Sequence, residues 1–246
     1  MTLPTIVSYY SPRPAEYGDR AHAYDEPIGI LEASCTRLGL RHILLTEKGN
    51  EDSSIPHVPA QRVVALDGTQ DLKLMRAIVA GQLAYLQAMG TGEGGTIFVG
   101  VDCLFLKDPS PVFDGGDWDV AVTVGPYSPG ALNNGAVFLA PGKNAEATRF
   151  YDLAFANCPD EWPGDQQAIQ RICYPLLKPG SIADRHGVRV RYLDMDTHNL
   201  PPACPDDPAI PGAYMLHHKG ARKEFMGAVA EQWLGIRRPE PSFVVR

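Results

Sequence analysis

The chain has 246 residues, with 22 lysines and arginines against 29 aspartates and glutamates and a formal net charge of −7. This acidic balance argues against extended nucleic-acid binding, which needs clustered basic side chains. No apolar run approaches the roughly 20 residues of a membrane-spanning helix, and the first residues, MTLPTIVSYYSPRP, lack a signal-peptide pattern. The five cysteines show neither CxxC pairs nor zinc-ligand spacing. We therefore expect a cytoplasmic protein with reduced thiols and no membrane span.

Strand-like and helix-like patterns alternate along the chain. Short apolar runs rich in β-branched and aromatic residues, bounded by glycine, proline or polar residues, predict strands. Strands are expected at residues 5–11, 42–46, 61–66, 96–106, 118–124, 136–139, 188–193 and 213–216. Apolar residues at helical spacing predict helices at residues 27–38, 70–89, 145–156, 165–173 and 222–234. The proline-rich stretch 200–211 is expected to form a surface loop.

This alternation is typical of an α/β protein. Because strands joined through helices pair in parallel, we expect a mixed, mostly parallel sheet flanked by helices on both faces. The chain is long enough for one large core, and no shift in composition divides it. We therefore expect a single domain over residues 1–236, followed by a C-terminal tail at 237–246.

Several common cofactor motifs are absent from the sequence. It contains no GxxxxGK[ST] loop, no GxSxG turn and no HExxH helix. The glycine-rich patch at 90–95 follows a predicted helix and precedes a predicted strand, the reverse of the order in a dinucleotide-binding loop. The sequence therefore argues against P-loop NTPase, serine hydrolase and zincin functions.

One acidic residue, Asp102, interrupts the apolar run TIFVGVDCLFLKDP of the strand expected at 96–106. A buried carboxylate without a partner costs too much free energy. Asp102 must therefore be neutralised, hydrogen-bonded, placed at an exposed strand end or bound to a cation. The plainer alternative is a carboxylate that caps the turn after the strand.

A second unusual segment, MLHHKGARKEF, contains the pattern HxxGxxK at His217, Gly220 and Lys223. An imidazole can ligate a divalent ion, a glycine lets the backbone approach a phosphate, and a lysine adds positive charge. The alternative is a basic surface loop before a helix. Together with Asp102, the pattern predicts a site for a metal ion and a diphosphate.

These motifs resemble, in their order, those of the GT-A fold nucleotide-diphospho-sugar transferases, in particular the glycogenin-like and lipopolysaccharide galactosyltransferase-like group. FVGVDCLFLKDPSPVF resembles the strand that ends in that family's DxD motif, with Asp102 at the second acidic position and Gly100 at the first. The other similar elements are an NxG element at Asn133 and Gly135, a DQ pair at Asp165 and Gln166, Asn199 after a late strand, and the closing HxxGxxK. The family's Trp and Pro after that lysine are replaced by Glu224 and Phe225.

The resemblance implies a metal-assisted transfer of a sugar from a nucleotide-diphosphate donor. A UDP-sugar is favoured, and the family's chemistry implies retention of the anomeric configuration. Asp102 and His217 are then the expected ligands of Mn²⁺ or Mg²⁺. Lys223 and Gly220 are expected to contact the diphosphate.

The same resemblance makes Asp165 and Gln166 the candidate catalytic residues beside the reacting sugar, although Asp165 is also a good N-cap for its helix. The further candidate donor-binding residues are Tyr10, Lys73, Arg76, Asn133 and Gly135. Plainer roles are open for them: a core position for the tyrosine, solvated helix charges for the lysine and arginine, and support of a turn for the asparagine.

Two alternative functions follow from departures in the sequence, which does not identify the acceptor. Gly100 removes one carboxylate from the metal motif, which favours a non-catalytic relative that binds a nucleotide sugar without turnover. A nucleotidyltransferase is less favoured, because SYYSPRPAEYGD is a poor match to a Gly- and Arg-rich triphosphate loop.

Overall fold

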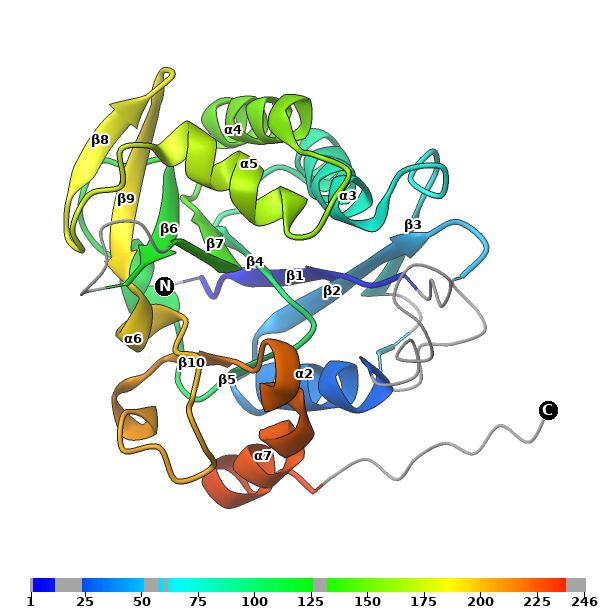
Figure 1. Cartoon of the computed structure of the whole chain (residues 1–246), viewed down its shortest axis with the longest axis vertical. Coiled ribbons are helices and arrows are strands. Elements are labelled where there is room, and N and C mark those ends of the chain that lie inside the picture. The colour runs from blue at the N-terminus through cyan, green and yellow to red at the C-terminus, as the bar shows by residue number, and fades with distance from the viewer. Residues whose placement is uncertain (1, 12–23, 51–57, 60–61, 126–131, 238–246) are drawn as a thin grey trace.

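A central sheet lies between two layers of helices in the computed structural model, which describes residues 2–11, 24–50, 58–59, 62–125 and 132–237 (Figure 1). The strand order in the sheet is β3-β2-β1-β4-β7-β6-β9-β8. Its strands are β1 (Thr5–Tyr9), β2 (Arg41–Glu47), β3 (Val63–Leu66), β4 (Thr96–Val99), β6 (Val120–Val124), β7 (Leu132–Leu139), β8 (Ile182–Arg185) and β9 (Val188–Asp194).

The sheet is mixed and mostly parallel, as predicted. β1 pairs in parallel with β2 and β4, β2 pairs in parallel with β3, and β6 pairs in parallel with β9. β7 is antiparallel to both β4 and β6, and β8 is antiparallel to β9. The predicted α/β class is therefore confirmed.

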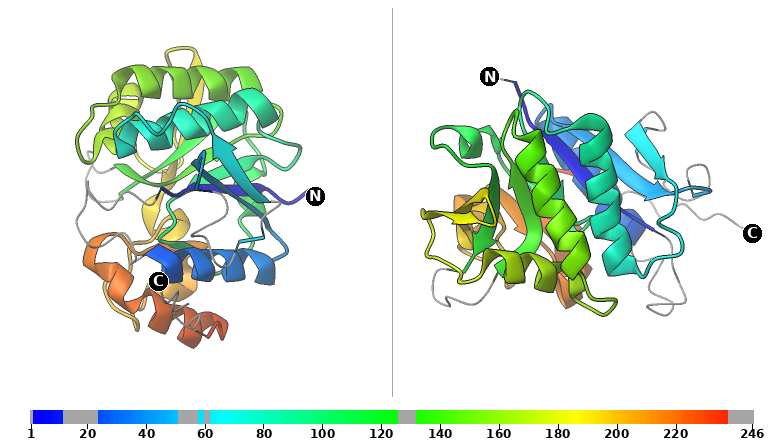
Figure 2. Two further views of the ribbon diagram at one scale, coloured as in Figure 1. Left: turned by 90° about the vertical axis from the view of Figure 1, so that its right-hand side faces the viewer. Right: turned by 90° about the horizontal axis from the view of Figure 1, so that it is seen from above.

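Helices cover both faces of the sheet, as the left view of Figure 2 shows. One layer contains α3 (Leu74–Met89), α4 (Asn144–Asn157) and α5 (Gly164–Cys173). The opposite side carries α2 (Asp25–Arg37), α7 (Met226–Leu234) and a small separate sheet of β5 (Cys103–Phe105) and β10 (Met215–His217). Within the described residues, none of the helices combines the length and apolar character needed to span a bilayer.

Neighbouring residues of the central strands pack into different cores, because side chains alternate between the two faces of a strand. Ile6 and Ile97 belong to the cluster that contains Leu31 of α2. Val7 and Phe98, the next residues, belong to the cluster on the side of α3, α4 and α5. Because both faces are covered, these strands read as continuous apolar runs in the sequence.

The strand predicted at 96–106 is wrong as a single element. The chain turns after β4, and the backbone N–H of Cys103 donates to the carbonyl oxygen of Gly100 at 3.2 Å. β5 then leaves the main sheet and pairs with β10. Asp102 therefore lies in a turn between two strands.

Other predicted boundaries also change. The helix expected at 70–89 begins at Leu74, and the one expected at 222–234 is a 3-10 turn, η5 (Gly220–Phe225), followed by α7. The strand expected at 136–139 begins at Leu132, and the expected loop 200–211 contains a bridge from Leu200 to Leu216. Elements that were not predicted are β8, α6 (Met195–His198) and the 3-10 turns η3 (Ser110–Phe113) and η4 (Ile210–Gly212). Residue 61 of the third predicted strand and residues 238–246 of the predicted tail lie outside the described residues.

Candidate functional site

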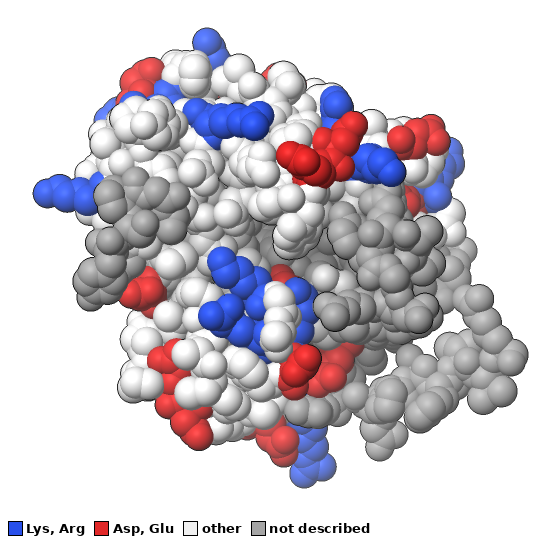
Figure 3. All heavy atoms as spheres, in the orientation of Figure 1, with Lys and Arg blue, Asp and Glu red and all other residues white. Residues whose placement is uncertain are grey.

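A cavity of about 230 Å³ opens beside the ends of β1 and β4, between α3 and α5 on one side and the β5–β10 sheet on the other. The predicted site residues that line it are Tyr10, Asp102, Gly135, Asp165, Gln166, His217, Gly220 and Lys223. Figure 3 shows a hollow at the centre of the molecule with Lys and Arg side chains gathered beside it. The fold thus brings motifs from distant parts of the chain to one cavity.

The β5–β10 pair places the two predicted metal ligands side by side. His217, the last residue of β10, lies opposite Cys103, the first residue of β5. The backbone N–H of His218 donates to the carbonyl oxygen of Asp102 at 2.8 Å. Main-chain bonds therefore fix Asp102 and His217 relative to each other.

The Asp102 carboxylate lies between two basic side chains. Its Oδ1 is 3.3 Å from Nε2 of His217, and its Oδ2 is 2.7 Å from Nζ of Lys223. Burial alone would raise the pKa of the Asp102 carboxyl, but His217 and Lys223 outweigh it and hold the pKa well below its usual range. The buried position that the sequence indicated is therefore occupied by an ionised carboxylate that lies between an imidazole and an ammonium group.

Gly100, at the first acidic position of the motif, leaves room for this arrangement. A Cβ at position 100 would lie 2.6 Å from Oδ1 of Asp102. Such a contact is too short to persist, so a side chain at this position would displace the Asp102 carboxylate. The absence of a side chain at position 100 and the observed placement of Asp102 are therefore linked.

β7 bends where it passes the cavity. Its pairing register with β6 shifts at a bulge, which leaves residues 134–136 without partners on β6. Bulges re-aim side chains next to active sites. Here Asn133 faces His217, with Oδ1 and Nδ1 3.0 Å apart, and Nδ2 of Asn134 donates to Oδ2 of Asp165 at 3.0 Å.

Gly135, at the same bulge, is required by close packing. A Cβ at this position would lie 2.0 Å from Nδ1 of His217, so any side chain here would push the imidazole out of place. The carbonyl oxygen of Gly135 accepts from the backbone N–H of Gly100 at 3.1 Å. The bulge is therefore bonded to the turn that carries Asp102.

Asp165 and Gln166 reach the cavity from the first turn of α5. The N-cap position belongs to Pro163, and Oδ1 of Asp165 accepts from the backbone N–H of Gln166 at 2.8 Å. Burial raises the pKa of the Asp165 carboxyl, and the hydrogen bonds from Gln166 and Asn134 offset part of this effect. The cavity wall formed by α5 is thus held by hydrogen bonds, in contrast to the ion pairs around Asp102.

The remaining predicted donor contacts lie in different places. Tyr10 lines the cavity just beyond β1, but Lys73 and Arg76, at the start of α3, are not among the described lining residues. Nε of Arg76 lies 3.7 Å from Asp160, and its guanidinium carbon lies 4.8 Å from the centre of the Phe155 ring. Roles of Lys73 and Arg76 in donor binding remain predictions.

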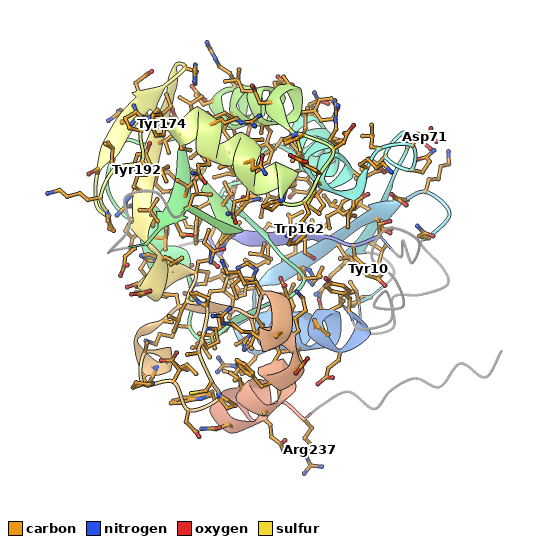
Figure 4. The ribbon with its side chains drawn as sticks, viewed as in Figure 1. Tyr10, Asp71, Trp162, Tyr174, Tyr192 and Arg237 are labelled. Atoms are coloured by element: carbon orange, nitrogen blue, oxygen red, sulfur yellow. The ribbon has the colours of Figure 1, made fainter. Side chains whose placement is uncertain are left out.

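Among the lining side chains that sequence reasoning missed are Tyr24, Trp162 and Lys219. Trp162, which precedes α5, is 69% exposed, and Figure 4 shows it apart from Tyr10, which also lines the cavity. Lys219 lies inside the HxxGxxK segment, and Trp162 lies three residues before Asp165. Their closeness in sequence to recognised motifs was the available signal.

The donor atoms near Asp102 fit a hard divalent ion. Ligand atoms of Asp102, Cys103 and His217 lie within 4.8 Å of one another. The Cys103 thiol donates to the carbonyl oxygen of Gly135 at 3.3 Å, and burial raises its pKa well above the usual value. It therefore remains a thiol. The remaining carboxylate and imidazole suit Mn²⁺ or Mg²⁺, with phosphate oxygens or water completing the coordination.

No protein-family model and no curated protein sequence matches the chain. Solved structures do. A glycosyltransferase involved in glycosylation of the major capsid of PBCV-1 has a TM-score of 0.53 and 14% identity, covering 91% of this chain and 99% of that one. The glycosyltransferase GlyE of Streptococcus pneumoniae has a TM-score of 0.56 and 14% sequence identity, and the match covers 94% of this chain and 64% of that one. The galactosyltransferase LgtC, solved with donor and acceptor sugar analogues, has a TM-score of 0.51 and 12% sequence identity. The match covers 96% of this chain and 98% of that one.

The chain has the GT-A glycosyltransferase fold. The fold predicted from the order of motifs is therefore confirmed. At these identities the likeness establishes the GT-A fold alone, so the reaction must be argued from the residues of the cavity.

Proposed function

We propose that the protein is a glycosyltransferase that moves a sugar from a nucleotide-diphosphate donor, preferably a UDP-sugar, to an acceptor that the structure does not identify. The observation that carries the proposal is the meeting of Asp102, His217 and Lys223 in one cavity of a GT-A fold. A carboxylate, an imidazole and an ammonium group are the groups that a metal–diphosphate complex requires.

Departure of the nucleoside diphosphate sets the chemical demand on this site. Negative charge grows on the phosphates as the anomeric bond breaks, so cations already in place lower the barrier. Asp102 and His217 would hold Mn²⁺ or Mg²⁺, which supplies charge neutralisation when bound. Lys223, whose present anionic partner is Asp102, would transfer its contact to a phosphate oxygen.

The opposite wall suits the sugar. Asp165 has a carboxyl that Asn134 and the backbone of Gln166 hold in one orientation, which positions it to accept hydrogen bonds from sugar hydroxyl groups. Gln166 lines the cavity beside it and would contact the reacting face. We propose retention of the anomeric configuration, in line with the family that the motifs resemble.

Donor binding is the first test. UDP- and GDP-sugars are added with and without Mn²⁺, and the thermal midpoint is measured. A ligand that binds only the native state raises the midpoint, and we expect the largest rise with a UDP-sugar and Mn²⁺ together. No shift with any nucleotide sugar under either condition would overturn the proposal.

Turnover is the second test, because it separates transfer from binding. Gly100 and the pairing of Asp102 with Lys223 favour a second candidate, a relative that binds the nucleotide sugar without reaction. Mass spectrometry would follow hydrolysis or transfer with a panel of sugar, peptide and lipid acceptors. Product formation supports the transferase, whereas a thermal shift without product on any acceptor supports the binding protein.

A further inference from the structure

The two ring nitrogens of His217 face two oxygen atoms. Nδ1 lies 3.0 Å from Oδ1 of Asn133, and Nε2 lies 3.3 Å from Oδ1 of Asp102. Neither oxygen carries a proton in this arrangement: one belongs to a side-chain amide and the other to an ionised carboxylate. A neutral imidazole has a single N–H and can therefore donate to one of them only.

Contacts around Asn133 decide which nitrogen carries that proton. Its Oδ1 also accepts the backbone N–H of Gly135 at 3.1 Å, and its Nδ2 donates to the carbonyl oxygen of Asn199 at 3.4 Å. These two bonds fix the amide with its oxygen toward His217. Nδ1 must then donate to Asn133. Nε2 is the nitrogen left to face Asp102, and in the neutral imidazole its lone pair would be free to ligate a cation held there.

Asn133 is itself held rigidly. It is 1% exposed, and its carbonyl oxygen accepts from Oγ1 of Thr123 at 2.8 Å and from Nδ2 of Asn199 at 3.0 Å. Nδ2 of Asn199 also donates to Oγ1 of Thr123 at 2.9 Å. A buried residue with hydrogen bonds at both its main chain and its side chain keeps one orientation, because any other would break several of them.

From these contacts we infer that Asn133 is a positioning residue, which fixes His217 with the proton on Nδ1 and so directs Nε2 to a divalent cation shared with Asp102. Metal-binding imidazoles need such a partner for their second nitrogen, and its loss weakens metal affinity. The inference rests on the proposed function, since it concerns the same metal. It gives Asn133 a role through His217, in addition to the direct sugar contact that remains a prediction.

The neighbouring asparagine provides a matched control. Asn134 lies on the same bulge and has the same side chain, but it bonds to Asp165 and not to His217. Electron paramagnetic resonance would measure free Mn²⁺ in titrations with UDP, which carries no sugar. We expect Asn133→Ala to weaken Mn²⁺ binding by about 10- to 100-fold and Asn134→Ala to leave it unchanged. Asn133→Asp, which keeps an oxygen at Nδ1, should bind within a few-fold of the wild type.

A spectroscopic readout excludes a merely structural role. Long-range ¹H–¹⁵N spectra with Mg²⁺ and UDP should show the His217 proton on Nδ1 in the wild type and in Asn133→Asp, and a mixture of forms in Asn133→Ala. The inference is overturned if Asn133→Ala keeps both the Nδ1 proton and the wild-type Mn²⁺ affinity. This holds also if the variant weakens the binding of complete UDP-sugars, because Asn133 would then contact only the sugar. Wild-type protein that binds no Mn²⁺ with UDP would instead overturn the metal site of the proposed function, and this inference with it.

Discussion

Two buried histidines of this protein have nearly the same surroundings, and only one of them lies in the cavity. His42 of β2 has Oγ of Ser8 at 2.8 Å from Nε2 and Oε2 of Glu32 at 2.8 Å from Nδ1. The other oxygen of Glu32 lies 3.0 Å from a guanidinium nitrogen of Arg62. The contacts therefore form a row in space: a neutral oxygen, an imidazole, a carboxylate and a cation.

His217 repeats this order with Asn133, Asp102 and Lys223, but its surroundings differ in two respects. The contact between imidazole and carboxylate is longer, 3.3 Å against 2.8 Å. His217 also lines the cavity together with its carboxylate and its lysine, whereas His42 is not among the described lining residues. The same components thus form a closed structural network in one place and a candidate ligand set open to the cavity in the other. Access and spacing, more than residue type, distinguish the two.

The largest effect, on the free energy of unfolding, should come from removing the carboxylate of the closed network around His42. Glu32→Gln keeps the shape of the side chain but removes the charge that pairs with His42 and Arg62. Loss of one partner of a buried ion pair costs about 3 to 5 kcal/mol, so the free energy of unfolding measured in urea should fall by that order. Affinity for a UDP-sugar should stay unchanged in the folded protein.

The pH dependence of this loss has a definite sign. Burial raises the pKa of the Glu32 carboxyl, but His42 and Arg62 outweigh it and lower the pKa overall. A depressed carboxyl pKa stabilises the fold above the unfolded value of about 4.3 and is lost on further acidification. The difference between wild type and Glu32→Gln should therefore shrink below about pH 4. Asp67→Asn removes an exposed pair with Lys48 and should cost less than about 1 kcal/mol; equal losses would contradict the comparison.

Removing the carboxylate from the candidate ligand set should lower activity and leave the fold stable. Asp102→Asn leaves a side chain of the same size without the charge that faces His217 and Lys223. Since partners of ligands alone contribute about 10- to 100-fold, loss of a ligand should lower Mn²⁺-dependent donor turnover by more than about 100-fold, or roughly 2.7 kcal/mol. Asp152→Asn, at an exposed position of α4, is the charge-matched control. Turnover that survives in Asp102→Asn would remove Asp102 from the metal site.

The part of the site carried by short motifs could be predicted from the sequence. A carboxylate in an apolar run and the HxxGxxK pattern mark Asp102, His217 and Lys223 locally, and all three line the cavity. The contact of Asn133 with His217 could not be predicted, because it depends on where the register between β6 and β7 shifts. Likewise, no local pattern shows that the turn after β4 starts a second sheet.

The fold shows the same limit. Strands covered on both faces were found because they are continuously apolar, whereas β8 was missed. Its sequence, IADR, lies at the edge of the sheet with partly exposed side chains and no apolar alternation. α6 has only four residues and none of them is buried, so it has no helical stripe to detect.

Position 100 tests whether spacing alone keeps the ligand set in place. In Gly100→Ala the new Cβ must displace the Asp102 carboxylate, which lies 2.6 Å away, while the backbone there needs no left-handed conformation. We expect Mn²⁺ affinity in the presence of UDP to fall by about tenfold, or roughly 1.4 kcal/mol, with little change in stability. Gly100→Asp should bind Mn²⁺ more tightly than Gly100→Ala, because its own carboxylate can ligate the ion when the Asp102 carboxylate is displaced. Gly212→Ala, where a Cβ meets nothing within 4 Å, should have no effect.

A third histidine, His198, extends the comparison to an imidazole with an unbonded nitrogen. Its Nδ1 is buried and has no hydrogen-bond partner among the described residues, and its ring stacks on Tyr214 with centroids 5.4 Å apart. Burial lowers the pKa of the His198 imidazole to about 4. The unfolded chain therefore takes up this proton first, and the stability that the neutral ring contributes is lost as pH falls from the unfolded value of about 6.5 toward 4.

His198→Phe keeps an aromatic ring against Tyr214 but cannot be protonated. The free energy of unfolding of this variant should decline less steeply between pH 6.5 and 4, by at most about 1.4 kcal/mol per pH unit. His186→Asn is the control, because His186 is exposed and its positive φ of 57° is one that asparagine tolerates. Parallel pH profiles for wild type and His198→Phe would mean that His198 finds a partner in the fold, and that hydrogen bonding does not separate it from His42 and His217.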